Sequence, residues 1–274
     1  MRITIRHATT YRYSTPAGSA LQLLRLTPRS HTGQFIRRWR VAVDSDARLD
    51  RSEDAFGNIT HLVFIEGPLS QAEIVIEGEV ETFDTNGVIH GGVERQPDRL
   101  FLRETALTRP TPAIRRFARD VAASQGGDLL ATLHRLNADL LKMLVFRVGA
   151  TSASTTAGEA FDAKTGVCQD FAHILIAAAR VLGFPSRYVS GYFLRTDTAD
   201  QEAGHAWMEA FVGGVGWIGF DPSHGLSPSD RYVRVAIGCD AQEAAPVRGS
   251  RIGGQQETLD VSLQVAQGRL MAQD

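Results

Sequence analysis

Polar and apolar residues alternate along most of residues 1–96, the spacing that places successive side chains on opposite faces of a strand. The alternation is clearest in four segments, which read ITIRHATTYRY, FIRRWRVAVD, ITHLVFIE and AEIVIEGEVETF. Turn-forming residues separate these segments at Thr15-Pro16, Phe56-Gly57-Asn58 and Gly67-Pro68. The pattern predicts an N-terminal antiparallel β sandwich or open barrel over residues 1–97.

From residue 98 the apolar spacing changes to three and four residues, which is typical of amphipathic helices. Residues 111–123 and 128–146 show it, and Asp128 is a plausible N-terminal cap of the second helix. Thr156 and Glu159 form a capping-box pattern that predicts a short helix. A further helix is expected to start near Cys168 and to end before Gly183.

Three strands are predicted after this helix, in the segments RYVSGYF, HAWMEAFV and GWIGFDPS. The last two are joined by the glycine-rich residues 213–216, which predict a hairpin. From about residue 240 the chain is rich in Ala, Gln and Gly, and only LDVSLQV reads as a strand there. The predicted fold class is therefore α+β, with residues 98–274 as a second domain that ends in this tail.

Composition narrows the class of protein further. The 274 residues are 43% hydrophobic and 22% charged, which is typical of a globular protein with a sizeable core. A net charge of −2 favours neither a nucleic acid nor an anionic membrane as partner. Arg37, Arg38 and Arg40 alternate with apolar residues and are interpreted as the solvent-facing side of a strand.

Two observations bear on the cellular compartment. The two cysteines of this long chain do not form a disulfide framework, and no stretch has the apolar length of a membrane span. The alternating N-terminus also lacks the apolar core of a signal peptide. A cytoplasmic protein is expected.

Cys168 lies in the first turn of a predicted helix, two residues after Gly166. Free backbone N–H groups and the helix dipole both favour a thiolate there. The dipole contributes only about 1 kcal/mol, whereas lowering a thiol pKa to about 4 requires roughly 6 kcal/mol. A reactive thiolate at this position therefore needs a nearby imidazolium.

His205 and Asp221 can supply the imidazolium and a carboxylate that orients it. His205 opens one predicted strand and Asp221 closes the next, so a hairpin makes their side chains neighbours. Together with Cys168 they have the layout of a nucleophile, an acid–base group and an orienting group.

The run GVCQDFAHILIAAARVLGFPSRYVSGY, followed by GHAWMEAFVGGVGWIGFDPSHG, resembles the transglutaminase-like superfamily of papain-related thiol enzymes. The resemblance implies a papain-like core with its nucleophile helix on an antiparallel sheet. It also implies that Cys168 is the nucleophile, His205 the general acid–base and Asp221 the orienting carboxylate. The N-terminal HATTYRYSTP is similar to the β-rich region that precedes this core in bacterial members. One departure is Val148, which stands where those relatives often carry a tyrosine.

The residues around the predicted triad have simpler interpretations. Asp170 near the helix start is expected to bond backbone N–H groups, and Gln169 to belong to the entry turn. Trp207 shares a strand face with His205 and is expected to screen the site from water. His224 is a loop residue that could line the cleft. His173 is interpreted as a core histidine and Cys239 as structural.

A metal site is the rival chemistry. Cys168, His205, Asp221 and His224 are zinc ligands by type, yet their spacing matches no established zinc motif. No metal and no cofactor are predicted.

The predicted function is acyl transfer through a Cys168 thioester, most simply amide hydrolysis by a cysteine peptidase or deamidase acting on a protein or peptide. Transglutaminase cross-linking is an alternative. A peptide-binding module without turnover is the alternative from another class. Substrate, oligomeric state and the role of the N-terminal region are not readable from the sequence.

Overall fold

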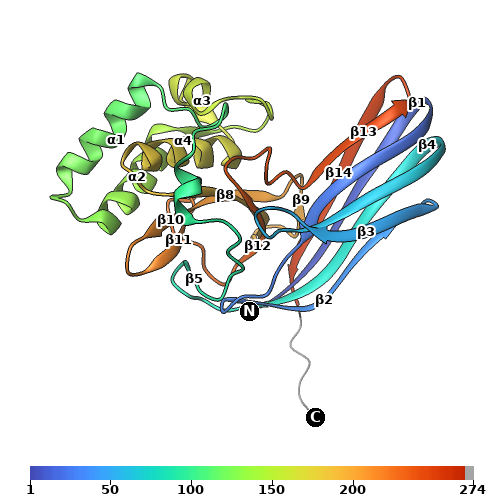
Figure 1. Ribbon diagram of the computed structural model, residues 1–274, viewed down its shortest axis with the longest axis horizontal. Coiled ribbons are helices and arrows are strands. Elements are labelled where there is room, and N and C mark those ends of the chain that lie inside the picture. The colour runs from blue at the N-terminus through green and yellow to red at the C-terminus, as the bar shows by residue number, and fades with distance from the viewer. Residues whose placement is uncertain (269–274) are drawn as a thin grey trace, which may run out of the picture.

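The computed structural model describes residues 1–268. Two antiparallel sheets dominate it, and the α-helices gather on one face of the second sheet (Figure 1). The fold class is therefore α+β, as predicted.

The first sheet has seven strands and curls into an open half-barrel (Figure 1). Its central strands, β1 and β4, are long enough to pair with different partners along their two halves. The strands of this sheet are β1 (Arg2–Thr27), β2 (Gln34–Val43), β3 (Ala47–Glu53), β4 (Ile59–Thr82), β9 (Asp200–Gln201), β13 (Val247–Gly253) and β14 (Glu257–Gln267).

Two of the predicted turns lie inside these long strands. Thr15-Pro16 falls within β1 and Gly67-Pro68 within β4, where the register of the β1–β4 pair shifts. A Cβ at Gly67 would lie 2.3 Å from the carbonyl oxygen of Ala17, so glycine permits a close crossing of the two strands there. The turn prediction was wrong at these two sites because Gly and Pro also mark irregular pairing within a sheet.

The second sheet carries the predicted catalytic strands. Its order is β12-β8-β10-β11-β5, and β10 and β11 form the predicted hairpin. Its strands are β5 (Val88–Ile89), β8 (Ser186–Phe193), β10 (His205–Val212), β11 (Gly216–Phe220) and β12 (Tyr232–Gly238). A separate parallel pair consists of β6 (Val145–Phe146) and β7 (Thr165–Gly166).

Two helices begin at the caps that the sequence predicts, Asp128 and Thr156, and a third begins at Thr111, which is not predicted as a cap. Thr111 and Asp128 accept hydrogen bonds from the backbones of Ile114 and Ala131, and Thr156 forms a capping box with Glu159. The helices are η1 (Asp98–Leu102), α1 (Pro112–Ser124), α2 (Leu129–Met143), α3 (Ala157–Ala163) and α4 (Cys168–Val181).

Helix α4 lies at the centre of the main hydrophobic core. Its residues 171–179 are almost entirely buried, between β10 on one side and α1, α2 and α3 on the other. A helix enclosed on all sides cannot shift easily, so its N-terminus is fixed with respect to β10.

The C-terminal tail differs from the expectation. Strands β13 and β14 pair with β1, so residues 247–267 complete the N-terminal sheet and do not extend the region after residue 98. β14 also pairs with β9, and Leu263 and Val265 share a hydrophobic cluster with β8 and β12. Local periodicity predicts the strand LDVSLQV but cannot show which distant strand it joins.

Candidate active site

Cys168 is the first residue of α4 and is half-buried. Asp170, in the first turn, accepts hydrogen bonds from the backbone N–H of Val167 at 2.8 Å and the Thr151 hydroxyl at 2.6 Å. A Cβ on Gly166 would lie 2.6 Å from Asp170, which explains the glycine. Asp170 therefore holds the entry to the helix, as its sequence position suggests.

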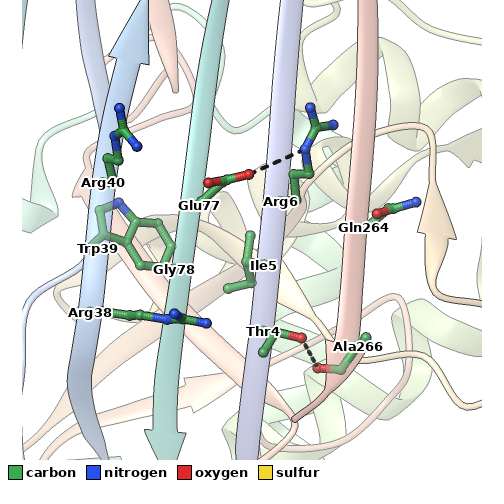
Figure 2. A pocket seen from close by; sticks show the side chains of 10 residues that line it. All are labelled: Thr4, Ile5, Arg6, Arg38, Trp39, Arg40, Glu77, Gly78, Gln264 and Ala266. Carbon is green, nitrogen blue, oxygen red and sulfur yellow. Dashed lines mark hydrogen bonds and ion pairs between the residues drawn. The ribbon is translucent and has the colours of Figure 1, made fainter.

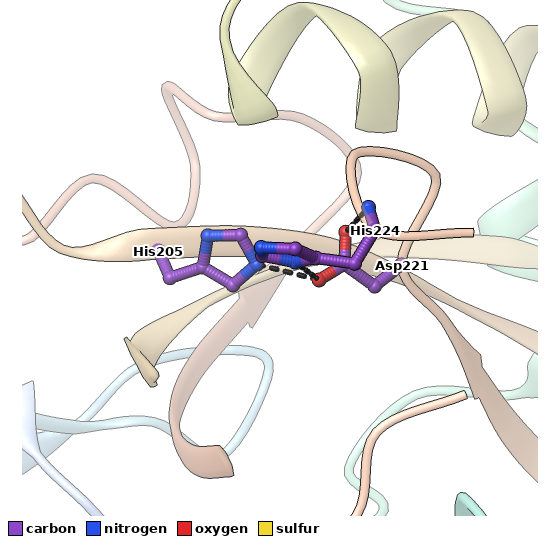
Figure 3. Close-up of side chains that lie close together, drawn as sticks. All are labelled: His205, Asp221 and His224. Atoms are coloured by element: carbon purple, nitrogen blue, oxygen red, sulfur yellow. Dashed lines mark hydrogen bonds and ion pairs between the residues drawn. The ribbon is translucent and has the colours of Figure 1, made fainter. Parts of the chain in front are cut away.

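His205 and Asp221 meet at the end of the β10–β11 hairpin. His205 Nε2 lies 2.7 Å from Asp221 Oδ2, with the His205 side chain 10% exposed and Asp221 fully buried (Figure 3). This pair forms because His205 starts β10 and Asp221 directly follows β11. The predicted neighbourhood of these two side chains is present in the structure.

Cys168 and His205 line the same cleft, which has a volume of about 850 Å³. Burial opposes a charge on His205, but hydrogen bonds with Asp221 and Cys168 outweigh it and raise the pKa of His205 to about 10. Because Nε2 faces Asp221, Nδ1 is the ring nitrogen left for the thiol. The cleft therefore holds a protonated imidazole next to the Cys168 side chain.

Asp221 receives more hydrogen bonds than the sequence suggests. Its Oδ2 also accepts from His224 Nδ1 at 2.7 Å and from the Tyr232 hydroxyl at 2.8 Å, and Oδ1 accepts from the Ser223 hydroxyl at 2.6 Å. Burial acts to raise the pKa of Asp221, but the hydrogen bonds from His205 and His224 hold it well below its ordinary value. Asp221 is therefore ionised at neutral pH.

The sequence does not predict that Tyr232 belongs to the site. It lies on β12, which reaches the site only because β12 pairs with β8 and β8 with β10. No motif or spacing near Asp221 signals this contact.

His205, Asp221 and His224 bring potential metal-ligating atoms within 4.8 Å of one another. Both histidine nitrogens that face Asp221 lie at hydrogen-bonding distance from an ionised carboxylate, which cannot donate, so both must carry hydrogen. In this structure the three side chains form a hydrogen-bonded cluster.

The remaining predicted residues lie around this cluster. Trp207 is buried, and its ring stacks on His205 with 6.1 Å between centroids, which fits the predicted screening role. Gln169 is half-buried in the first turn of α4 and is not among the residues that line the cleft. His173 is fully buried and accepts a hydrogen bond from the backbone of Ala241, so the geometry is that of a core histidine.

The two walls of the cleft differ in character. One wall carries Phe146, Val148 and Val167, and the first two are 52% and 68% exposed. The backbone of Arg147 bonds to Gly166 through the β6–β7 pair, so this apolar wall is fixed beside the nucleophile.

The opposite wall is the polar segment 195–204. It contains an ion pair between Arg195 and Asp197 and the strand β9, which pairs with β14 of the N-terminal sheet. The half-barrel thus holds one rim of the cleft in place.

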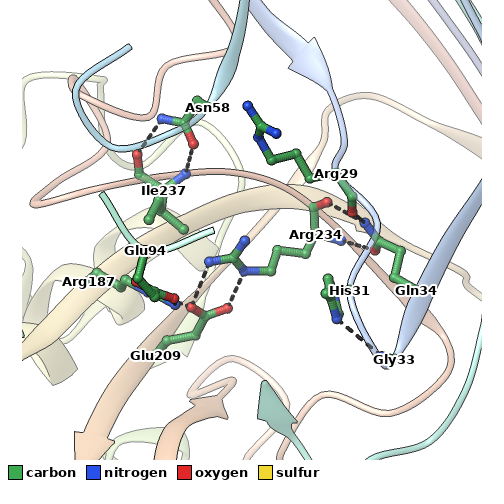
Figure 4. Close-up of polar contacts among 10 residues, drawn as sticks. All are labelled: Arg29, His31, Gly33, Gln34, Asn58, Glu94, Arg187, Glu209, Arg234 and Ile237. Atoms are coloured by element: carbon green, nitrogen blue, oxygen red, sulfur yellow. Dashed lines mark hydrogen bonds and ion pairs between the residues drawn. The ribbon is translucent and has the colours of Figure 1, made fainter. Parts of the chain in front are cut away.

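A buried cluster of charged side chains connects β10 to β8 and β12. Glu209 is fully buried and accepts charged hydrogen bonds from Arg187 at 2.6 Å and Arg234 at 2.7 Å (Figure 4). Gln34 and Asn58 of the N-terminal region bond to the backbones of Arg234 and Ile237 on β12 (Figure 4). These contacts join the two sheets next to the strand that carries His205.

A second hollow lies on the N-terminal sheet, around Trp39 (Figure 2). Arg6, Arg38 and Arg40 line it, but Glu77 lies 3.5 Å from Arg6, and Arg38 lies 3.6 Å from Glu79. This mixture of charges fits a solvent-facing strand surface.

No helix among residues 1–268 has the length and apolar character needed to cross a membrane. The cytoplasmic location stays a prediction.

Comparisons with known proteins agree with the fold and the motifs. An uncharacterized protein of Mycobacterium leprae is 28% identical over 96% of this chain and 98% of its own length. One from Mycobacterium tuberculosis is 29% identical over 96% of this chain and 92% of its own length. A Pseudomonas aeruginosa protein-glutamine gamma-glutamyltransferase is 29% identical over 29% of this chain, which is 13% of that protein.

Among solved structures, that of a "putative cysteine protease" from Cytophaga hutchinsonii covers all of this chain and 92% of its own, with a TM-score of 0.76 and 20% identity. At this identity the likeness concerns the fold alone.

Two family models match, and together they cover more than half of the chain. The bacterial transglutaminase-like N-terminal region matches residues 3–81, and the transglutaminase-like superfamily matches residues 115–222, which include Cys168, His205 and Asp221. Residues 115–222 are therefore assigned to the transglutaminase-like superfamily, and residues 3–81 to the bacterial transglutaminase-like N-terminal region.

Proposed function

We propose that this protein is a thiol enzyme that hydrolyses amide bonds of proteins or peptides through a Cys168 thioester. The observation that carries the proposal is the 2.7 Å pair of His205 with buried Asp221, in a cleft that also contains Cys168 at the start of α4. The raised pKa of His205 supports an imidazolium that would keep the thiol ionised at neutral pH.

In the first step, the Cys168 thiolate forms a C–S bond to the carbon of a carboxamide. The C–N bond breaks as the His205 imidazolium gives its proton to the departing amine. The backbone N–H of Cys168, at the free end of α4, is placed to stabilise the oxyanion, a contribution of about 3 kcal/mol.

In the second step, water attacks the thioester carbon and loses a proton to His205. The C–S bond breaks, the acid product leaves, and the thiolate–imidazolium pair is restored. Asp221 holds the imidazole in one orientation throughout, because it bonds Nε2 in both steps.

Cross-linking is the second candidate function. It differs only in that a primary amine, and not water, attacks the thioester. The local similarity to a protein-glutamine gamma-glutamyltransferase favours this candidate, although it covers only 29% of the chain.

Thiol labelling tests whether the site is catalytic. We expect iodoacetamide to label Cys168 near pH 6 on the order of a hundred times faster in the wild type than in His205→Ala, since an unperturbed thiol is almost fully protonated at that pH. Cys168→Ala gives the background from buried Cys239. Equal labelling of wild type and His205→Ala would favour a binding module without turnover.

Mass spectrometry of glutamine-containing peptides separates the reactions. The peptides are incubated with the enzyme in the presence and in the absence of a primary amine. A cut backbone indicates a peptidase, and conversion of the glutamine amide to an acid indicates a deamidase. An adduct of the amine indicates a transglutaminase. We expect hydrolysis products that are lost in Cys168→Ala and unchanged by a chelator.

A further inference from the structure

Asp221 Oδ2 is shared by three donors from three places in the chain. His205 on β10, His224 in the turn after β11 and Tyr232 on β12 lie 2.7, 2.7 and 2.8 Å from it. A carboxylate offers about four lone-pair sites over its two oxygens. A third donor on one oxygen therefore competes with the other two for the same electron density.

Orientation of His205 alone requires one hydrogen bond. The two additional donors withdraw charge from Oδ2 and so reduce the stabilisation that Asp221 gives to the His205 imidazolium. The proton that His205 gives to the leaving group and later takes from water is the one on Nδ1, because Nε2–H stays bonded to Asp221. An imidazolium that is stabilised too strongly releases this proton poorly.

Ring packing fixes His224 in the position from which it donates to Asp221. Its ring packs on Phe193 with 4.7 Å between centroids, and its side chain is 39% exposed at the cleft. It also packs on the ring of His205 with 5.1 Å between centroids (Figure 3). Because ionised Asp221 cannot donate, the Nδ1 of His224 carries hydrogen and its Nε2 is the free ring nitrogen.

The other charged groups near this cluster do not replace these donors. Among residues 1–268, hydrogen bonds to the Asp221 side chain come from Ser223, His205, His224 and Tyr232. Cys168 approaches His205 from α4, and the charged residues of the cleft rim are Arg195, Asp197, Asp200, Glu202 and Arg231.

We propose that His224 is a positioning residue of this site: together with Tyr232 it fixes the shared oxygen of Asp221 and limits how strongly that carboxylate stabilises the His205 imidazolium. A catalytic role for His224 rests on the proposed function. The effect of His224 on the pKa of His205 does not rest on it, and this effect can be measured without substrate.

The test follows the titration of His205 by NMR in histidine-labelled protein, assigned with His205→Gln, from about pH 5 to pH 11. His224→Phe keeps a ring in place and removes the donor, and Tyr232→Phe removes the other donor. We expect each to raise the pKa of His205 by about 0.5 to 1 unit, and the double variant to raise it further.

His224→Asn is the matched rescue, because its amide N–H lies where Nδ1–H lies in histidine. We expect it to titrate like the wild type. The proposal is overturned if His224→Phe leaves the pKa of His205 unchanged, or if His224→Asn shifts it as much as His224→Phe. Should His224→Phe not fold, an unchanged titration in Tyr232→Phe overturns it as well.

The same variants distinguish this inference from the proposed function. If the titrations shift as expected but His205→Ala does not alter the labelling of Cys168, the cluster is real and the enzyme proposal fails. If labelling depends on His205 but the titrations do not move, only the role of His224 fails.

Discussion

At the scale of single residues, the proposed reactivity of Cys168 rests on the charge of Asp221. Asp221→Asn keeps an oxygen near His205 Nε2 but removes the negative charge that raises the pKa of the imidazole. We expect iodoacetamide labelling of Cys168 near pH 6 to slow by roughly a hundredfold, with the fold retained.

Asp197→Asn is the control for this substitution. Asp197 lies on the rim of the same cleft but pairs with Arg195. Its loss is expected to change labelling less than about twofold. Similar rates for Asp221→Asn and the wild type would show that the carboxylate does not activate the thiol.

At the scale of elements, β6 sets one wall of the cleft. Phe146 and Val148 present apolar surface to solvent next to Cys168, an arrangement that suits an apolar group on the acyl side of a substrate. We expect Val148→Asp to lower Cys168 acylation by a long-chain nitrophenyl ester about 5- to 10-fold relative to acylation by nitrophenyl acetate.

Val145→Asp is the matched control for the wall. Val145 is 57% exposed on β6, three residues before Val148, but is not among the residues that line the cleft. The ratio of the two acylation rates should stay at the wild-type value. A ratio that falls equally in both variants would mean that the effect comes from the added negative charge and not from contact with the acyl group.

At the scale of the whole molecule, the buried pairs of Glu209 link β10 to β8 and β12. Burial favours the neutral acid, but Arg234 and Arg187 outweigh it and lower the pKa of Glu209 to about 2. Glu209→Gln leaves these two arginines without their buried counter-charge, and we expect a loss of about 3–5 kcal/mol in the free energy of unfolding.

Glu77→Gln provides the comparison, because Glu77 pairs with Arg6 on the exposed sheet surface, where both side chains are about half exposed. Denaturant unfolding should show a change below about 0.5 kcal/mol for this variant. Equal losses of unfolding free energy in Glu209→Gln and Glu77→Gln would contradict the inference that burial makes the ion pairs of Glu209 important for stability.

Two buried histidines, His7 and His173, and the half-buried His31 make the whole molecule sensitive to acid. Burial lowers the pKa values of His7, His31 and His173 from 6.5 to about 4. Between about pH 6.5 and pH 4 these histidines are protonated in the unfolded chain but neutral in the folded chain. The stability that they contribute is therefore fully present above about pH 6.5 and is lost as the pH falls towards 4.

Each of these histidines should remove about 2 kcal/mol of stability between pH 8 and pH 5. Denaturant unfolding at the two pH values measures the sum. His173→Gln keeps an acceptor for the backbone N–H of Ala241. In this variant the difference in unfolding free energy between pH 8 and pH 5 should be smaller by about 2 kcal/mol, the contribution of one histidine. An unchanged difference would show that His173 can be protonated in the folded state. His205 acts in the opposite direction, since its raised pKa removes stability as the pH rises towards 10.

The sequence by itself determined the parts that depend on short spacings. The caps at Asp128 and Thr156, the start of α4 at Cys168 and the β10–β11 hairpin all follow from neighbouring residues. The pair of His205 with Asp221 belongs to this group, because a hairpin of known register brings its two ends together.

Only the tertiary structure decided which distant segments meet. Tyr232 reaches Asp221 through the strand order of a whole sheet, and β14 pairs with β1 across more than two hundred residues of chain. The physical reason is that strand pairing depends on loop closure and on burial of complete sheet faces, neither of which is encoded in the local alternation of polar and apolar side chains.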